Sequence, residues 1–554
     1  MAQAIAGNIE GQPILILKEG SSESKGREAQ RRNIMAAKII AEAVKSSLGP
    51  KGMDKMLVDG MGDVAITNDG ATILKEMDVQ HPVAKIMVEV AKTTDQEVGD
   101  GTTSAAILAG ELLTNAENLL EQGVHPTIIV GGYREATEKA LKFGQQIAMT
   151  VSPTDKEVLR KVGSTSLASK MVSEHKDYLS DLGVQAILHV AEKEGDKYKV
   201  ELDDIKVEKK TGKSLGETEL IKGIVLDKEV VHSGMPKKID NAKIALLNCA
   251  LEIEKTEFDA KINIQSPEKL KEFLDAEQDM LKDMVDKIAK TGANVVICQK
   301  GIDDVVQHYL AKAGILAVRR VKESDMNKLA KATGGNVMNI INALTKGDLG
   351  WAKTVEERKI EEDKWTFVED CKNPKSVTLL IRGGTKKVIE EAERAMHDVL
   401  SVVRDVVVNP QIVAGGGAPE IEIASKLKGW AEKVSGREQL AVQEFARALE
   451  SIPITLAQNA GLDPIDILVE LRAKHQKGMK WTGVDVFGGK VSDMEKLNIY
   501  EPFSVKEQII KSASEAATMI LRIDDVIASG KSKMPAGPPP GAGGMPPGMP
   551  PGEY

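Results

Sequence analysis

The chain has 554 residues, 42% of them hydrophobic, and a formal net charge of −9. This length predicts about three or four domains, with enough apolar residues to fill several cores. Its 83 acidic residues outnumber 74 basic ones, which argues against a nucleic-acid-binding protein. The sequence contains no uninterrupted apolar run of about 18 residues, so no membrane span is predicted.

The cysteines and histidines argue against a disulfide framework and against a zinc site. Cys249, Cys298 and Cys371 lie far apart without CxxC spacing, and the histidines form no HExxH motif. A disulfide-stabilised or zinc-binding chain would show such spacings. We therefore expect a reducing, cytoplasmic location.

The first part of the chain is predicted to be mostly helical. Apolar residues recur at intervals of three and four through 28–48, which predicts an amphipathic helix that ends at Gly49-Pro50. Two short strands, 56–59 and 65–67, are expected to form a hairpin around Gly60-Met61-Gly62. Two further helices are expected at 82–98 and 102–122.

The middle of the chain alternates strands and helices, which predicts βαβ units around a mixed or parallel sheet. The expected order is strand 294–298, helix 302–313, strand 315–321 and helix 325–332, the last capped by Ser324. A long helix is predicted to precede them, from Ser266-Pro267 to Lys290. Glu277 interrupts its apolar stripe, so we expect one end to be less completely buried.

An acidic, glycine-flanked turn leads directly into a predicted helix within residues 97–110. A helix N-terminus presents unpaired N–H groups and partial positive charge, so it can bind an anion such as phosphate. Gly101 permits close backbone approach, and the hydroxyls of residues 102–104 add donors. Asp100 would repel phosphate unless a Mg²⁺ ion lay between them. The same residue types are also typical of ordinary helix caps.

Two common nucleotide-binding motifs are missing. The sequence contains two GKS tripeptides, but Val207 and Asp525 occupy the upstream positions where the Walker motif requires glycine. No GxGxxG motif follows a predicted strand into a helix, which argues against a Rossmann dehydrogenase. The remaining possibility is a site assembled from several separate turns.

Four glycine-containing turns are able to expose backbone donors: 49–52, 68–70, 99–104 and 415–417. If they converge, they would surround a polyphosphate, with Asp100 and Asp69 as oxygen ligands of Mg²⁺. Hydrolysis also needs a carboxylate that orients or deprotonates water, and Asp398 on a predicted helix at 387–402 suits this role, although a solvated helix face is the ordinary alternative. Convergence requires that the chain leave one domain and later return to it.

Segments in this order resemble the group II chaperonins, the TCP-1 family, and their archaeal members above all. They are GREAQRRNI (26–34), SSLGPKGMDKMLVD (46–59), ITNDGATIL (66–74), VGDGTTS (98–104), KGIDDVVQHYLAK (300–312), GGGAPE (415–420), SGREQLAVQEFA (435–446) and LRIDDVI (521–527). The resemblance spans essentially the whole chain. The sequence departs from the family at Ala168-Ser169, where the resemblance leads us to expect Thr-Gly.

The resemblance implies a multi-domain α+β and α/β chaperonin fold. A mostly helical equatorial domain would comprise residues 1–150 and 408–530, and a small intermediate domain residues 151–222 and 378–407. An α/β apical domain, 223–377, would carry a helical lid protrusion at about 245–285, within which 258–281 matches the family. Residues 531–554, rich in proline, glycine and methionine, are expected to be a disordered tail.

The resemblance also implies roles for individual residues. Asp100 matches the Mg²⁺ ligand, Lys170 the lysine that senses the terminal phosphate, and Asp69 and Asp398 the catalytic carboxylates that position and activate water. The remaining residues are expected to contact the nucleotide: Leu48, Gly49, Pro50, Gly70, Gly101, Thr102, Thr103, Ser104, Gly415, Gly416, Asp485 and Glu501.

The implied function is an ATP-dependent chaperone that encloses unfolded proteins and hydrolyses ATP, with ATP or ADP and Mg²⁺ bound. Its expected partners are unfolded proteins, identical or paralogous subunits in two rings of about eight or nine, and the co-chaperone prefoldin, with neither nucleic acid nor membrane. Two alternatives stay open: a Mg-ATP-dependent small-molecule phosphotransferase, and a ring scaffold that does not hydrolyse ATP. A native mass near one or two subunits would favour the phosphotransferase. Intact assembly without ATP hydrolysis would favour the scaffold.

Overall fold

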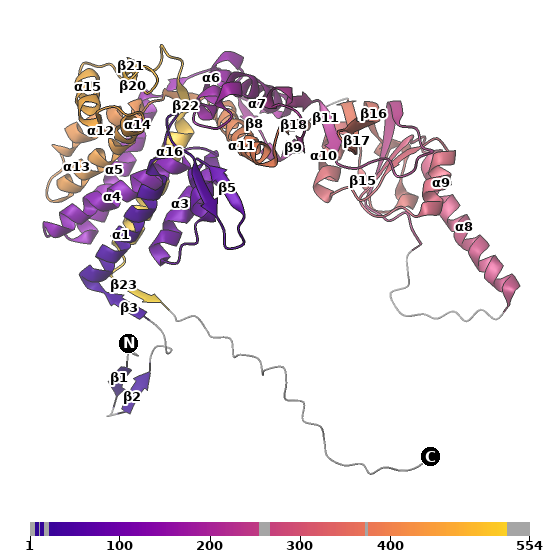
Figure 1. Ribbon diagram of the computed structural model, residues 1–554, viewed down its shortest axis with the longest axis horizontal. Helices are drawn as coiled ribbons and strands as arrows, with labels where there is room; N and C mark the ends of the chain where they lie inside the picture. Colours follow the sequence, from indigo (N-terminus) through magenta and orange to yellow (C-terminus); the bar gives the residue numbers. More distant parts are fainter. Residues whose placement is uncertain (1–5, 10–11, 16–21, 254–265, 372–374, 529–554) are drawn as a thin grey trace, which may run out of the picture.

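The computed structural model describes residues 6–9, 12–15, 22–253, 266–371 and 375–528. The predicted disordered tail lies outside these ranges. Figure 1 shows an arched molecule with a helical body at one end, a smaller connecting region, and a body built on a sheet at the other end. Two segments from near the ends of the described chain meet beside the helical body, where β3 (Ser22–Lys25) pairs antiparallel with β23 (Asp525–Ala528). The chain therefore leaves this body and returns to it.

The helical body is organised around α4 (Thr102–Glu121), which is buried along most of its length because α1, α3, α13 and α16 pack around it. The apolar stripe predicted for α1 is buried against α4 and its neighbours. None of the helices in the described ranges is long and apolar enough to cross a membrane. The other helices of this body are α1 (Gly26–Lys45), α2 (Gly70–Glu76), α3 (Pro82–Val98), α5 (Pro126–Ile147), α12 (Ala418–Ala431), α13 (Glu438–Leu449), α14 (Ser451–Asn459), α15 (Pro464–Gln476) and α16 (Phe503–Leu521).

The predicted hairpin and N-terminal helices are confirmed, with small shifts at their ends. The hairpin consists of β4 (Lys55–Val58) and β5 (Val64–Thr67). Helix α1 ends at Lys45, earlier than predicted, because the hydroxyl of Ser47 donates to the carbonyl of Val44 at 2.7 Å and closes the last turn. Such a local hydrogen bond competes with helix extension, so the turn begins before Gly49-Pro50.

In the connecting region α7 (Lys176–Val190) and α11 (Lys386–Val408) pack against a small sheet, and α6 (Lys156–Leu167) packs against these two helices. In that sheet β18 (Val377–Gly383) lies between β9 (Ile205–Thr211), to which it is parallel, and β10 (Glu219–Ile221), to which it is antiparallel. The buried side of α11 belongs to the same hydrophobic core as the helical body. This helix therefore joins the two regions mechanically.

The third body has a mixed sheet and a hydrophobic core of its own. Strands β12, β13 and β14 are parallel, whereas β11, β17, β16 and β12 run antiparallel in that order. This confirms the βαβ prediction. The elements are β11 (Gly223–Leu226), β12 (Lys238–Leu247), α8 (Pro267–Lys290), β13 (Val295–Cys298), α9 (Asp304–Lys312), β14 (Leu316–Val318), α10 (Glu323–Thr333), β15 (Val337–Met338), β16 (Gly350–Ile360) and β17 (Asp363–Cys371). The predicted cap of α10 is wrong, because Ser324 lies inside its first turn.

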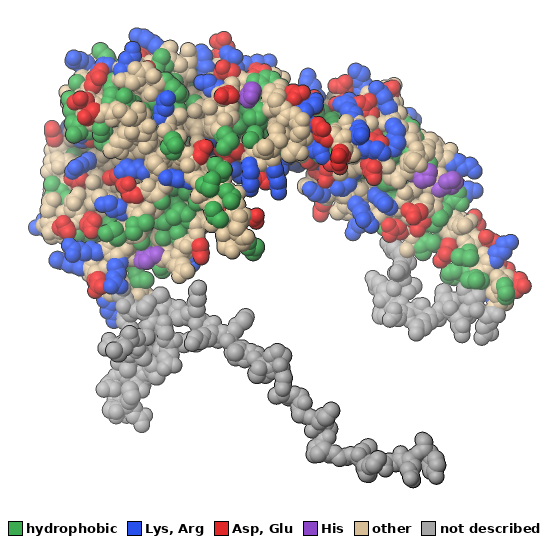
Figure 2. Space-filling model, in the orientation of Figure 1, with side chains coloured by type: hydrophobic (Ala, Val, Ile, Leu, Met, Phe, Trp, Pro, Cys, Tyr) green, Lys and Arg blue, Asp and Glu red, His purple; other side chains and the backbone are tan. Residues whose placement is uncertain are grey.

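Helix α8 is buried at one end and exposed at the other, as the position of Glu277 predicted. Leu281 and Ile288 are buried in the sheet body. Toward the N-terminus of the helix the apolar side chains of Leu270, Phe273 and Leu274 are 47%, 42% and 50% exposed. Figure 2 shows hydrophobic side chains near the projecting tip of this helix. Of the predicted protrusion, residues 254–265 lie outside the described ranges.

Candidate functional site

A cavity of about 630 Å³ lies where the returning chain meets the first part of the chain. Its walls come from segments before residue 105, from the connecting region and from segments after residue 410. The predicted site residues that line it are Leu48, Gly49, Pro50, Asp100, Gly101, Ser104, Gly416, Asp485 and Glu501. The remaining predicted residues lie outside this lining, and several of them support it.

One wall is the junction between α3 and α4. Gly99 ends α3 with φ of +66° and Gly101 precedes α4 with φ of +78°, a backbone region that favours glycine. The N–H of Gly101 donates to Oδ1 of Asp100 at 2.6 Å. A Cβ atom on Gly101 would lie 2.6 Å from Cδ1 of Ile509, so a side chain does not fit there. The N-terminus of α4 is thus fixed in position as part of the cavity wall.

Helix α2 braces this junction from behind. Asp69 caps α2 by accepting from the N–H of Thr72 at 2.8 Å, and its other oxygen accepts from the hydroxyl of Thr102 at 3.0 Å. A Cβ on Gly70 would lie 2.8 Å from Cα of Thr103, so the two helix N-termini touch. Asp69, Gly70, Thr102 and Thr103 therefore lie behind the lining, and they fix the first turn of α4.

A buried ion pair lies next to this wall. Nζ of Lys170 lies 2.8 Å from Oδ2 of Asp398, and the two side chains are 8% and 9% exposed. Lys170 follows α6, whereas Asp398 lies on α11. Neither residue lines the cavity, but their neighbours Ser169 and Val402 do. The pair is therefore held just behind the lining by elements of the connecting region.

The charges near this pair are unbalanced. Burial alone would lower the pKa of Lys170, but Asp398, Asp69 and Asp100 raise it above its ordinary value. Burial raises the pKa of Asp398 well above its usual range, with further repulsion from Asp69 and Asp100 and opposition from Lys170. Burial would also raise the pKa of Asp69, but Lys170 and two hydrogen bonds outweigh it and lower that pKa. Three carboxylates around one ammonium group suit an added cation.

The opposite wall is built by the returning chain. β19 (Gln411–Ala414) leads into Gly415-Gly416-Gly417, and this loop is fixed between β20 (Thr482–Asp485) and β22 (Tyr500–Pro502). The N–H of Gly415 donates to the carbonyl of Ile499 at 3.0 Å, and the N–H of Val484 donates to that of Gly416 at 2.8 Å. Gly415 does not line the cavity, but a Cβ there would lie 2.8 Å from a carboxylate oxygen of Glu501. The loop must therefore remain glycine.

Two acidic side chains occupy this wall. Asp485 ends β20 and accepts from the N–H of Gly488 at 2.7 Å. Glu501 pairs with Lys506 at 2.5 Å, and Lys506 also lies 2.9 Å from Glu420. Burial raises the pKa of Glu501, and Glu420 adds to this, although Lys506 opposes it. Both carboxylates are thus held at the lining by short local contacts.

Sequence reasoning missed the apolar part of the cavity and the residue that fixes Leu48-Gly49-Pro50. The side-chain amide of Asn459, at the end of α14, donates to the carbonyls of Lys45 and Leu48 at 3.0 and 2.9 Å. Nothing in its sequence context signals this long-range contact. The apolar lining, suited to a flat ring, includes Ile452, Leu456, Val484, Val486, Phe487, Leu497, Ile499, Val505 and Ile509.

Two buried polar atoms near the cavity have no partner within the described residues. The hydroxyl of Ser166, which lines the cavity, is one of them. The other is the carbonyl oxygen of the Asn68 side chain, whose amide donates to the carbonyl of Ser169. Buried polar groups normally form hydrogen bonds, so unpaired atoms here fit a polar ligand. The Asn68 contact also fixes the Ala168-Ser169 turn.

Comparisons with known proteins agree with this architecture. A model of the TCP-1/cpn60 chaperonin family matches residues 40–531. The thermosome subunit beta of Archaeoglobus fulgidus is 58% identical over 539 residues, covering 97% of this chain and 98% of the relative. A thermosome subunit of Pyrococcus horikoshii is 59% identical over 521 residues, covering 94% and 95%. The open state monomer of a group II chaperonin from Methanococcoides burtonii matches with a TM-score of 0.59 at 45% identity, covering 77% of this chain and all of that one.

The fold and the cavity therefore define a chaperonin subunit, and the chain belongs to the TCP-1/cpn60 chaperonin family. Its relatives in this comparison are thermosome subunits and a group II chaperonin. The predicted multi-domain chaperonin fold is confirmed. ATP-dependent chaperone function and ATP hydrolysis, predicted from the sequence, follow from membership of the family.

Proposed function

We propose that the 630 Å³ cavity is the ATP site and that hydrolysis there drives a protein-folding chamber. The observation that carries this proposal is the meeting, in one cavity, of the Leu48-Gly49-Pro50 turn, the N-terminus of α4 and Gly416. A helix N-terminus with Asp100 beside it suits a phosphate chain with a metal ion. The apolar lining suits the base, with Asp485 and Glu501 placed to accept hydrogen bonds from base or ribose.

Asp100 is the proposed ligand of Mg²⁺, which would neutralise phosphate charge when bound. The excess of carboxylates over ammonium groups near Lys170 supports this assignment. The hydroxyls of Ser104 and Ser166 would donate to oxygens of the ligand. Thr102 and Thr103 would act by fixing the first turn of α4, because they lie behind the lining.

Asp398 is the proposed base for the attacking water, with Asp69 supporting it. In the structure Lys170 pairs with Asp398. A terminal phosphate would compete for Lys170, and a buried carboxylate that loses its ion pair becomes a stronger base. Because Lys170 follows α6 and Asp398 lies on α11, this exchange would couple nucleotide binding to the position of the connecting region.

The domain plan is proposed with the boundaries expected from the sequence: equatorial 1–150 and 408–530, intermediate 151–222 and 378–407, apical 223–377. The separate hydrophobic core of the sheet body and the shared core along α11 support it. The proposed partners are unfolded proteins, prefoldin, and identical or paralogous subunits in two rings of about eight or nine. A cytoplasmic location stays a prediction.

The test is Asp398→Ala in the assembled protein. We expect ATP turnover to fall at least about a hundredfold, the loss typical of removing a general base, while ATP affinity changes little. Glu393→Gln is the matched control, because Glu393 lies on the same helix in an exposed pair with Lys209. Normal turnover in Asp398→Ala would refute the assignment. A native mass of one or two subunits with retained phosphoryl transfer would instead favour a phosphotransferase.

A further inference from the structure

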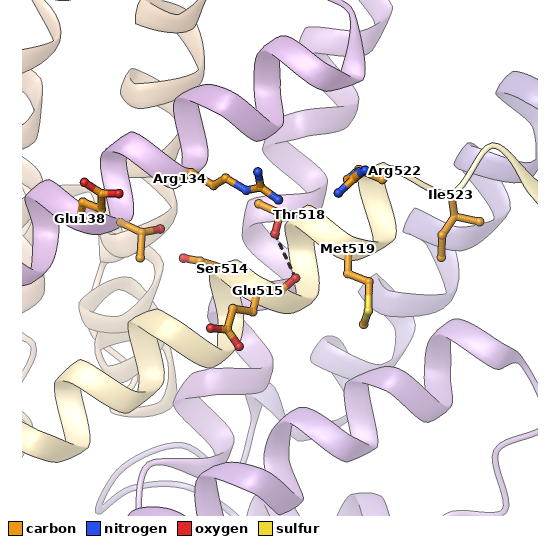
Figure 3. A pocket seen from close by; sticks show the side chains of 9 residues that line it. Arg134, Glu138, Ser514, Glu515, Thr518, Met519, Arg522 and Ile523 are labelled. Carbon is orange, nitrogen blue, oxygen red and sulfur yellow. Dashed lines mark hydrogen bonds between the residues drawn. The ribbon is translucent and has the colours of Figure 1, made fainter.

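A second cavity, of about 730 Å³, lies between α5 and the end of α16 (Figure 3). None of its lining residues belongs to the ATP cavity. One wall is formed by Arg134, Thr137 and Glu138 of α5. The rest of the lining comes from the C-terminal half of α16 and the two residues that follow it: Ser514, Glu515, Thr518, Met519, Arg522 and Ile523.

The guanidinium groups of Arg134 and Arg522 point toward one another across this cavity (Figure 3). Within the part of the chain that the structure describes, neither arginine forms a hydrogen bond or an ion pair through its side chain. Glu138 and Glu515 also line the cavity, but their carboxylates are turned away from the space between the two guanidinium groups. Both arginines are exposed to solvent, and because two facing cations repel one another, the space between them favours an anion.

A buried hydroxyl group adds a separate observation. Ser514 is 4% exposed, and its Oγ has no hydrogen-bond partner within the described residues. The neighbouring hydroxyls are satisfied, since Thr137 donates to the carbonyl of Tyr133 at 2.8 Å and Thr518 to that of Glu515 at 3.0 Å. An unpaired buried hydroxyl is costly, and a ligand oxygen would satisfy it.

We propose that this cavity binds a small phosphate-bearing anion, separately from the ATP site. Each guanidinium presents several N–H donors in one plane and recognises phosphate through paired hydrogen bonds. Groups that approach from two sides, with a hydroxyl as a further donor, match the several oxygens of a phosphate better than the two of a carboxylate. The proposed binding donors are the guanidinium groups of Arg134 and Arg522, with the hydroxyl of Ser514 in the lining of the same cavity.

The test uses the full-length assembled protein with its ATP cavity saturated by ADP, and inorganic pyrophosphate as the probe. Calorimetric titration is expected to show saturable binding. Arg134→Gln and Arg522→Gln should each weaken it at least about tenfold, and Ser514→Ala about threefold, in line with the loss of hydrogen bonds to a charged ligand. ATP turnover should remain unchanged in all three variants, which separates this site from the proposed ATP site.

The matched control is Arg447→Gln, which removes an equal charge from an exposed position on α13 and should leave pyrophosphate binding unchanged. Native mass checks that each variant assembles. If Arg522→Gln fails to assemble, Arg134→Gln and Ser514→Ala still decide the question. Absence of pyrophosphate binding to the assembled protein overturns the proposal. This result is also expected if a neighbouring subunit covers the cavity, and it overturns the proposal in that case too. Equal binding by wild type and the arginine variants overturns it too.

Discussion

At the scale of single residues, the proposed ATP cavity depends on glycines that stand where no side chain fits. Gly101 combines a left-handed backbone with a neighbour, Ile509, that fills the space a Cβ would need. Gly70 and Gly415 have ordinary backbone angles but touch Thr103 and Glu501 closely. Each of these glycines therefore sets how near two elements approach, and together they set the shape of the cavity.

Gly101→Ala is expected to lower both stability and ATP affinity. The alanine would be strained at φ of +78° and its Cβ would push against Ile509. Gly123→Ala is the matched control, because Gly123 has the same φ of +78° with nothing within 4 Å of the added Cβ. The backbone strain shared by both variants should cost about 1 kcal/mol. Thermal unfolding and ATP titration would measure the extra loss in Gly101→Ala, and equal effects of the two variants would contradict this explanation.

At the scale of elements, α11 connects the helical body with the connecting region. Nη2 of Arg404 donates to the carbonyl of Glu97, at the end of α3, at 2.7 Å. Asp405 accepts from Nε of Arg404 at 2.9 Å and from the hydroxyl of Ser504, on α16, at 3.2 Å. These contacts fix one end of α11 to the wall of the proposed ATP cavity. Motion of the helix therefore has a fixed point near Asp405, with Asp398 two turns away.

Burial raises the pKa of Asp405 from 3.8 to about 6, although Arg404 opposes the shift. Between these values the folded chain binds the proton more tightly than the unfolded chain does, so the stability from this group is present at low pH and is lost as pH rises toward 6. Asp405→Asn should remove this part of the pH dependence. Unfolding temperatures from pH 4 to pH 7 would measure it, with exposed Asp283→Asn as control. An unchanged slope in Asp405→Asn would contradict the assignment.

At the scale of the whole molecule, the sequence predicts the secondary-structure elements better than the tertiary contacts between them. The bounds of α3 and α8 and the β13–α9–β14 unit follow from local periodicity, caps and alternation. The N-terminus of α4 could be predicted as an anion site because Gly101 and the hydroxyl residues are adjacent in sequence. These features depend on interactions within one or two turns.

Features that depend on distant contacts could not be predicted in this way. Asn459 fixes the Leu48 turn across more than 400 residues. The facing arginines of the second cavity, Arg134 and Arg522, are equally remote from one another in the chain. Asp69 and Asp398 are candidates on sequence alone, but only the family resemblance distinguishes them from the many acidic residues that are simply solvated. The topology of the fold brings such residues together, and local sequence patterns do not show which distant segments will meet.

The most direct test of the central proposal is a structure of the assembled protein with Mg²⁺, ADP and a transition-state analogue of the terminal phosphate. The nucleotide is expected in the cavity between Gly49 and Gly416, with a metal ion on the carboxylate of Asp100. The analogue is expected beside Lys170 and Asp398. A nucleotide bound elsewhere, or bound in this cavity with its phosphates remote from Asp100, would contradict the account.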